Sequence, residues 1–269
     1  QAIAIADKKE IPVIASVATN DQLTAKREFA NRVCFTDSFQ GEVVANYAKA
    51  QAYKTAVVVV DQSQVYSLGL AKAFETAFKK NGGEIVKTIK ITSGDKDFKA
   101  VVSQIKETNP DFMFLPLYHP EASMIARQSK QLGLEKPMFS GDGVANQTFI
   151  DLGGDSVNGY MFTDFFDSTN PPSQKSADFV AYHEKETGKA EMNSFTALGA
   201  DTYNILIDAM NRCEDPTNSV CINEQIKKTT DFDGVSGKIT INKEGNATRS
   251  AVIKEVKDGV NLFRNPQQT

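Results

Sequence analysis

The first part of the chain alternates short apolar runs with longer stretches in which apolar residues recur every three or four positions. The run 55–60 reads TAVVVV, a β-branched segment that is typical of a central parallel strand. The stretches 37–52 and 69–80 show the helical period. The first of them carries on one face Phe39, Val43, Val44, Tyr47 and Ala48. Further strands are expected at 11–14, 84–91, 112–117, 137–139 and 159–163, and further helices after Asp95 or Asp97 and from Pro120 to Gly133. This alternation predicts a doubly wound parallel-sheet lobe of the α/β class.

Two polar side chains in the stretch 111–146 follow directly on expected strands. Tyr118 comes after the apolar run 112–117, and Asp142 comes after the run that starts at Pro137. In an open parallel sheet, ligands bind at the carboxyl ends of the strands. We therefore expect the Tyr118 phenol and the Asp142 carboxylate to face the same crevice.

The pattern changes after residue 163, where a linker-like run at 164–175 contains NPP. Helices are expected near 176–187, 194–212 and 223–230, and strands at 237–241 and 247–256. These elements predict two lobes, one of residues 1–36 plus 166–243 and one of residues 37–165 plus 244–269. Several strand crossings would join them as a hinge, so a cleft that closes on a ligand is expected. Because the chain opens in what reads as the last turns of a helix, we expect that sequence before Gln1 is missing and that the first lobe is incomplete.

The composition and charge of the chain limit the classes of macromolecule or membrane that it is expected to bind. The chain has 269 residues, 41% of them hydrophobic, which is enough for one large or two medium cores. Its net charge of −4 is spread over interspersed acids and bases, so neither nucleic acid nor an anionic membrane is an expected partner. Apolar runs such as 56–60 are too short to cross a bilayer, so direct membrane insertion is not expected.

Cysteine spacing suggests a disulfide. Cys213 and Cys221 bracket a polar, turn-forming segment, and a bond between them would contribute roughly 2–3 kcal/mol and imply an oxidising compartment. The alternative is two unrelated thiols in a cytosolic protein. The two histidines, His119 and His183, have no ligand spacing with the cysteines, so no metal site is expected.

Polar patches at expected strand ends and helix starts supply the candidate chemistry, at 16–20, 61–66, 117–121 and 140–143. Their hydroxyls, backbone N–H groups, phenols and carboxylate suit a zwitterion. Thr19, with N–H groups at a helix start, would hold a ligand carboxylate, and Asp142 is the natural anion for an ammonium group. Each residue also has an ordinary interpretation: Asp142 as a turn aspartate, Tyr66 and Tyr118 as packing aromatics, and Thr19 as the N-cap of the segment from Asn20.

Motifs of common enzyme classes are not found. The sequence has no G-x-G-x-x-G after a strand, no G-x-x-x-x-G-K-[ST] and no G-x-S-x-G. Asp142 and Glu121 remain as an acid/base alternative that rests only on the proximity of their turns. We therefore expect a binding protein that uses no cofactor and catalyses no reaction.

Several segments in this order and spacing resemble a known family: IPVIASVATNDQLT, DQSQVYSLGLAKAF, GDKDF, PLYHPE and SGDGVAN. They are similar to the periplasmic substrate-binding proteins of branched-chain amino-acid ABC transporters, and the similarity continues through GVSGKITINKEGNA to the end of the chain. The resemblance implies the type I periplasmic-binding-protein fold, an amino acid as ligand and a membrane permease as partner. It also implies a periplasmic location, or an extracytoplasmic, lipid-anchored one in a single-membrane cell.

The resemblance also implies a set of ligand-binding residues. The family's carboxylate site falls on Val17, Ala18 and Thr19, its two aromatics on Tyr66 and Tyr118, and its ammonium-pairing acid on Asp142. Two departures matter. The best-known members carry glutamate where this chain has Asp142, and the first β-α units of the family, with a serine-bearing loop, have no counterpart here. A ligand-sensing domain of a receptor or regulator, for amino acids, amides or small acids, is the alternative function.

Overall fold

The computed structural model describes residues 2–189 and 192–264. The chain divides into two compact units, residues 1–36 with 165–251 and residues 37–164 with 252–269. Both these ranges and the lobes expected from the sequence include residues 1, 190–191 and 265–269, which lie outside the described residues. Each unit is described by itself below.

The unit of residues 37–164 and 252–264 is built on a seven-stranded sheet in the order β12-β11-β7-β6-β5-β3-β4. The strands are β3 (Thr55–Asp61), β4 (Glu84–Ile91), β5 (Phe112–Phe114), β6 (Met138–Ser140), β7 (Met161–Asp164), β11 (Val252–Lys257) and β12 (Val260–Arg264). The first five of these pair in parallel, whereas β11 pairs antiparallel with both β7 and β12. The predicted doubly wound parallel sheet is confirmed.

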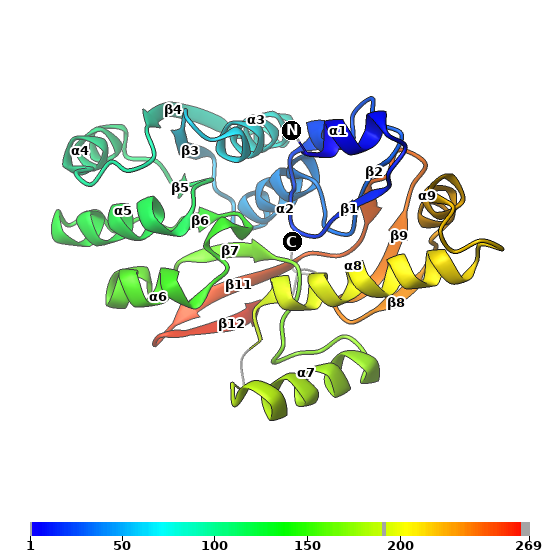
Figure 1. The fold of residues 1–269 in the computed structure, drawn as a ribbon. Helices are drawn as coiled ribbons and strands as arrows, with labels where there is room; N and C mark the ends of the chain where they lie inside the picture. Colours follow the sequence, from blue (N-terminus) through cyan, green and yellow to red (C-terminus); the bar gives the residue numbers. More distant parts are fainter. Residues whose placement is uncertain (1, 190–191, 265–269) are drawn as a thin grey trace. The chain divides into compact units, whose positions relative to one another are not determined.

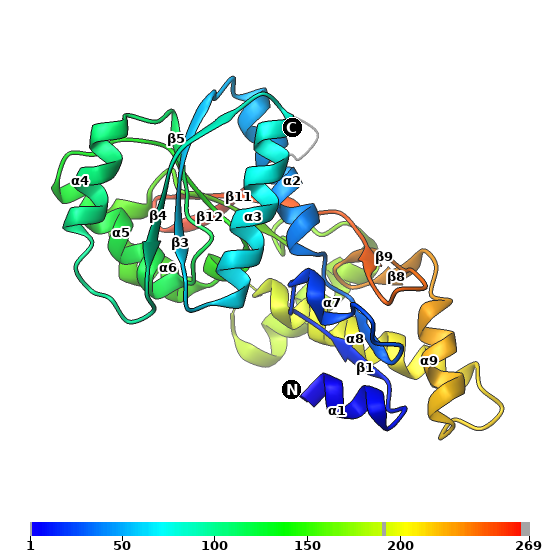
Figure 2. The same ribbon diagram turned by 90° about the horizontal axis from the view of Figure 1, so that it is seen from above.

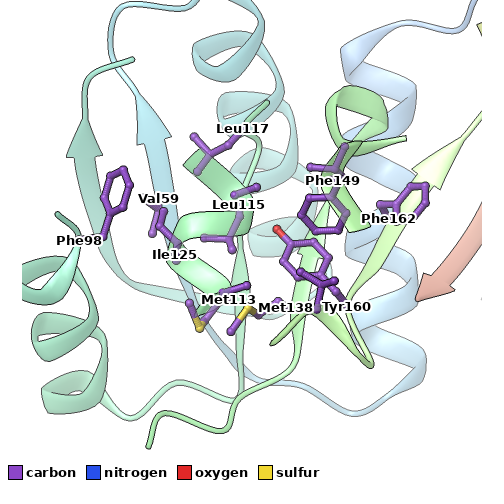
Figure 3. Close-up of a cluster of buried hydrophobic side chains, with 14 of the residues drawn as sticks. Val59, Phe98, Met113, Leu115, Leu117, Ile125, Met138, Phe149, Tyr160 and Phe162 are labelled. Carbon is purple, nitrogen blue, oxygen red and sulfur yellow. The ribbon is translucent and has the colours of Figure 1, made fainter. Parts of the chain in front are cut away.

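Helices cover both faces of this sheet, with α2 and α3 on one side and α4, α5 and α6 on the other (Figure 2). Their bounds are α2 (Asp37–Ala50), α3 (Val65–Lys80), α4 (Lys99–Thr108), α5 (His119–Gln131) and α6 (Gln147–Gly153). Figure 3 shows the core on the α5 side, where Val59, Leu115 and Ile125 meet. Val58 and Val60 point to the opposite core. This two-sided burial explains why β3 shows no polar alternation.

Strand β5 and helix α3 differ in extent from the expected ranges, and helix α2 differs in the residues that it buries. Strand β5 ends at Phe114, because Pro116 has no N–H to continue the ladder after Leu115 donates to Phe139. Helix α3 begins at Val65 rather than at residue 69, so that Tyr66, four residues before Leu70, joins its buried stripe. The buried face of α2 runs through Gln40, Val44 and Ala48, whereas Phe39, Val43 and Tyr47 are only partly buried.

The unit of residues 2–36 and 165–251 contains smaller sheets (Figure 1). Strand β1 (Val13–Ala15) pairs in parallel with β2 (Ala30–Arg32), and β8 (Phe232–Gly234), β9 (Gly237–Ile241) and β10 (Ala247–Thr248) form an antiparallel sheet. The helices are α1 (Ala2–Lys8), α7 (Gln174–Thr187), α8 (Ser194–Asn211) and α9 (Ser219–Lys227).

A disulfide joins Cys213 and Cys221, whose Cα atoms are 6.1 Å apart. Helix α9 begins before the expected residue 223 because the Asn218 side chain caps it, accepting from Cys221 N at 3.0 Å.

Residues 165 and 244–251 group with this unit, not with the other one as the sequence analysis expected. The physical reason lies in their contacts. Strand β10 pairs with β9, and the Phe165 ring stacks on Phe35 at 4.1 Å. The buried Arg249 guanidinium donates to the carbonyls of Val33, Phe165 and Ser236. The single strand expected at 247–256 is therefore two strands in different sheets, β10 and β11.

Candidate functional site

Asp142 follows β6 after a single residue, Gly141, at the carboxyl end of the parallel sheet, where it begins a short 3-10 helix (η2, Asp142–Val144). Its side chain is 5% exposed. Oδ1 accepts hydrogen bonds from Gln40 Nε2 at 3.0 Å and from the Tyr66 hydroxyl at 3.1 Å. The Asp142 backbone N–H donates to Gln40 Oε1 at 2.7 Å. The carboxylate is therefore buried and held through one of its two oxygens.

Burial controls the charge of this group. Desolvation raises the pKa of Asp142 from 3.8 to about 7, against the opposing effect of the hydrogen bonds from Gln40 and Tyr66. The Asp164 carboxylate raises it further, although Asp164 is itself paired with Lys254 Nζ at 3.0 Å in a buried ion pair. Asp142 thus titrates near neutral pH, and a cation placed against it would favour the charged form.

Tyr66 and Tyr118 lie beside this carboxylate. Their rings stack with centroids 5.0 Å apart at an interplanar angle of 27°. Besides donating to Asp142, the Tyr66 hydroxyl accepts from Gly143 N at 3.0 Å. Burial and the carboxylates of Asp142 and Asp37 raise the pKa of both phenols, so both stay protonated. Tyr66 is 9% exposed and Tyr118 is 42% exposed, so Tyr118 is the ring that solvent reaches.

The loop before α3 fixes Tyr66 in place. The Asp61 side chain at the end of β3 accepts from Ser63 N at 2.9 Å, from the Ser63 hydroxyl at 2.6 Å and from the Ser93 hydroxyl. The Asp61 backbone N–H donates to Ser67 Oγ at 2.8 Å. Burial raises the pKa of Asp61, but the bonds from Ser63 and Ser93 outweigh it and the pKa lies below its ordinary value. The polar patch 61–66 is thus mainly a structural cap that positions Tyr66.

Val17, Ala18 and Thr19 lie in the other unit, in the loop after β1. Thr19 is buried, whereas Val17 and Ala18 are exposed. The guanidinium of the fully buried Arg32 holds this loop from behind, donating to Ala18 O at 3.0 Å and to Asn20 O at 2.8 Å. Thr19 is not an N-cap. That role belongs to Asn20, whose side chain accepts from Gln22 N.

Gln40 was not singled out from the sequence. It contacts Asp142 across 102 positions of the chain, and it also accepts from the buried Thr163 hydroxyl. A signal was nevertheless present, because Gln40 stands four residues before Val44 and eight before Ala48 on the helical stripe that the structure buries. A polar amide in such a stripe indicates a buried partner.

Glu121, the other carboxylate of the acid/base alternative, accepts from Gly94 N at 2.9 Å, in the loop between β4 and α4. Within the ranges 2–189 and 192–264, no group of three or more histidine, cysteine, aspartate or glutamate side chains is arranged to hold a metal ion. In those same ranges the structure contains no helix with the length and apolar character needed to span a membrane.

The sequence pattern of the periplasmic binding protein family matches residues 1–260. A Leu/Ile/Val-binding protein of Escherichia coli (strain K12) is 29% identical over 244 residues, which are 90% of this chain and 64% of that protein. One of Rhizobium johnstonii is 29% identical over 239 residues, 88% of this chain and 64% of that protein. The chain therefore spans just under two thirds of the length of these curated relatives.

Solved structures give the same match. A leucine binding protein from Thermotoga maritima superposes with a TM-score of 0.94 at 36% identity, covering 98% of this chain and 75% of that one. The branched-chain amino acid transporter substrate binding protein from Streptococcus pneumoniae, in complex with isoleucine, superposes with a TM-score of 0.88 at 28% identity, covering 98% and 76%.

Proposed function

This chain belongs to the periplasmic binding protein family, and from that membership we propose that it captures an amino acid outside the cytoplasm and delivers it to the membrane permease of an ABC transporter. Its fold is the α/β type I periplasmic-binding-protein fold. The proposed ligand is a branched-chain or related aliphatic or aromatic amino acid. The two units are the proposed ligand-binding lobes, and the proposed location is the periplasm or, in a single-membrane cell, the outer surface as a lipid-anchored protein.

The observation that carries this proposal is the environment of Asp142. The carboxylate is 5% exposed at the carboxyl edge of a parallel sheet, next to two stacked phenol rings. Its pKa is raised to about 7 by burial, so it lacks a cationic partner strong enough to keep it ionised. The α-ammonium group of an amino acid would supply that partner and form a charge-assisted hydrogen bond.

The remaining site residues complete the proposed recognition of a zwitterion. Val17, Ala18 and Thr19 are proposed to bind the α-carboxylate through the loop that Arg32 holds. The exposed ring of Tyr118 is proposed to cover the aliphatic part of the ligand. The names of the relatives, which are proteins that bind leucine, isoleucine and valine, support the choice of ligand class.

The test is isothermal titration calorimetry of the purified protein with L-leucine, L-isoleucine, L-valine and L-phenylalanine. Each is compared with the analogue that lacks the ammonium group, for example 4-methylpentanoate for leucine. We expect at least one amino acid to bind and its deaminated analogue to bind far more weakly, because a buried anion would then remain unpaired. Equal affinity for leucine and 4-methylpentanoate, or no binding of any of the amino acids, would contradict the proposal.

A further inference from the structure

We propose that Gln40 is a positioning residue for the Asp142 carboxylate: its amide holds the backbone and one carboxylate oxygen of Asp142 at once, so that Oδ2 is the oxygen presented to an ammonium ligand. This inference rests on the proposed function, since it names the residue that prepares the same site. Gln40 is fully buried in the first turns of α2 and belongs to the same unit as Asp142.

The orientation of the Gln40 amide follows from its partners. A backbone N–H can only donate, and the one on Asp142 lies 2.7 Å from one end of the amide, which must therefore be the oxygen. The Thr163 hydroxyl donates to the same oxygen. The nitrogen then faces Asp142 Oδ1 at 3.0 Å. Gln40 thus donates to the carboxylate with an orientation that the Asp142 backbone N–H fixes and the Thr163 hydroxyl complements.

The hydrogen bonds of the carboxylate are divided unequally between its oxygens. Oδ1 accepts from both Gln40 Nε2 and the Tyr66 hydroxyl. In the described part of the chain, both hydrogen bonds that the carboxylate accepts from other side chains end on Oδ1, and none ends on Oδ2. Because Oδ1 is already occupied by two donors, a ligand N–H is expected to approach Oδ2, which makes the rotation of the carboxylate, and hence Gln40, important for affinity.

The backbone next to this contact has no room for a side chain. A Cβ on Gly141 would lie 2.6 Å from Gln40 Oε1 and 2.6 Å from the Tyr66 hydroxyl. The two groups that hold Oδ1 therefore pack directly on the Gly141 backbone. This close packing indicates that Gln40, Tyr66 and Asp142 are held in one defined arrangement, and that the contact of the buried amide is not incidental.

The test replaces Gln40 by methionine, which keeps the length of the side chain and removes both polar ends. We expect the affinity for L-leucine in calorimetry to fall about tenfold to a hundredfold, as for loss of a hydrogen bond to a charged group. We also expect the pKa of the Asp142 carboxyl in the ligand-free protein, followed by carbon-13 NMR, to rise above its wild-type value, because a donor to the charged form is gone. The matched control is Gln147→Met, which removes a bond of 2.9 Å from Gln147 to Asp151 on the exposed face of α6 and should change neither quantity.

A second variant covers the case in which Gln40→Met does not fold. Gln40→Glu keeps an oxygen for Asp142 N and Thr163 but sets a second carboxyl against Oδ1, so the pair should hold one proton well above neutral pH. Leucine binding at pH 8 should then release a proton in this variant and almost none in the wild type. The readout is calorimetry in two buffers of different ionisation enthalpy.

Unchanged affinity and unchanged Asp142 titration in folded Gln40→Met protein would overturn the positioning role, as would the absence of proton release in Gln40→Glu. Failure of the proposed function is distinguishable from this, because the wild-type protein itself would then bind no amino acid. In that case the NMR titration of ligand-free protein still decides whether Gln40 controls Asp142.

Discussion

The hydroxyl of Tyr66 donates to Oδ1 of Asp142 at 3.1 Å and accepts from Gly143 N at 3.0 Å. The hydroxyl therefore both donates and accepts a hydrogen bond inside the protein. The sequence suggested Tyr66 as a ligand-binding phenol, whereas this geometry gives its hydroxyl the task of holding the carboxylate and the turn that carries it. Its ring is buried and stacks on Tyr118, which is the ring of the pair that solvent reaches.

Removal of the Asp142 charge is expected to abolish tight binding. Asp142→Asn keeps the shape of the side chain and its acceptor for Gln40 and Tyr66, but leaves the ligand ammonium without a counter-charge. The expected loss in binding free energy for L-leucine is about 2–5 kcal/mol, measured by calorimetry. Asp151→Asn, on the exposed face of α6, is the control and should bind as the wild type does. Wild-type affinity in Asp142→Asn would remove Asp142 from the site.

A single methyl group at position 141 should disturb the same arrangement. Gly141→Ala would press a Cβ against Gln40, Tyr66 and Leu70, and we expect the free energy of unfolding to fall by about 1–3 kcal/mol, with weaker leucine binding. The matched control is Gly199→Ala in the interior of α8, where a Cβ meets nothing within 4 Å. That change should raise stability by roughly 0.5–1 kcal/mol, because alanine is the better helix former. Urea unfolding of both variants measures the difference, and equal effects of the two changes would contradict the tight packing at Gly141.

Stability should depend on pH through Asp142. Because its pKa in the folded protein, about 7, lies above the ordinary value of 3.8, the folded state keeps a proton that the unfolded state releases between about pH 4 and 7. The stability that this group contributes is therefore fully present below about pH 4 and is lost as pH rises to 7, by up to roughly 4 kcal/mol. Urea unfolding of ligand-free wild type and Asp142→Asn at pH 4.5, 6 and 7.5 tests this. The variant should gain stability relative to the wild type as pH rises, and parallel pH profiles would rule the linkage out.

The disulfide between Cys213 and Cys221 should act on stability alone. It closes a loop with a sequence separation of 8, and its removal is expected to cost about 2–3 kcal/mol of unfolding free energy. Thermal unfolding of the Cys213→Ser, Cys221→Ser double variant measures the loss, and leucine affinity should stay at the wild-type value. A reductant should destabilise the wild type and leave the double variant unaffected. If the reductant has no effect on the wild type, the bond contributes no stability.

The sequence was sufficient to place two of the candidate residues at one edge of the sheet. Tyr118 lies shortly after β5, which ends at Phe114, and Asp142 shortly after β6, which ends at Ser140. A parallel sheet sets such residues at its carboxyl edge whatever the order of the strands. The lengths of the strands could not be predicted from the hydrophobic periodicity alone. Pro116 shortens β5. Strand β10 has only two residues, and its pairing with β9 is not predicted by any local sequence pattern.

Gln40 marks the limit of prediction from one sequence. Its partner Asp142 is 102 residues away, and an amide on a helix is usually exposed to solvent. Only the packing of α2 against the sheet turns this position inward, and that packing depends on the whole unit. Similarly, the sequence alone could not show that Arg32, which contacts the loop of residues 17–19, is buried and not an ordinary surface arginine.

The most direct test of the account is a carbon-13 NMR titration of the Asp142 carboxyl with and without L-leucine. In the ligand-free protein its pKa should lie at about 7. In the presence of saturating leucine it should fall by at least about 2 units, because the ligand ammonium favours the charged form. A carboxyl that titrates at the same pH with and without bound leucine would contradict the claim that Asp142 binds the ammonium group.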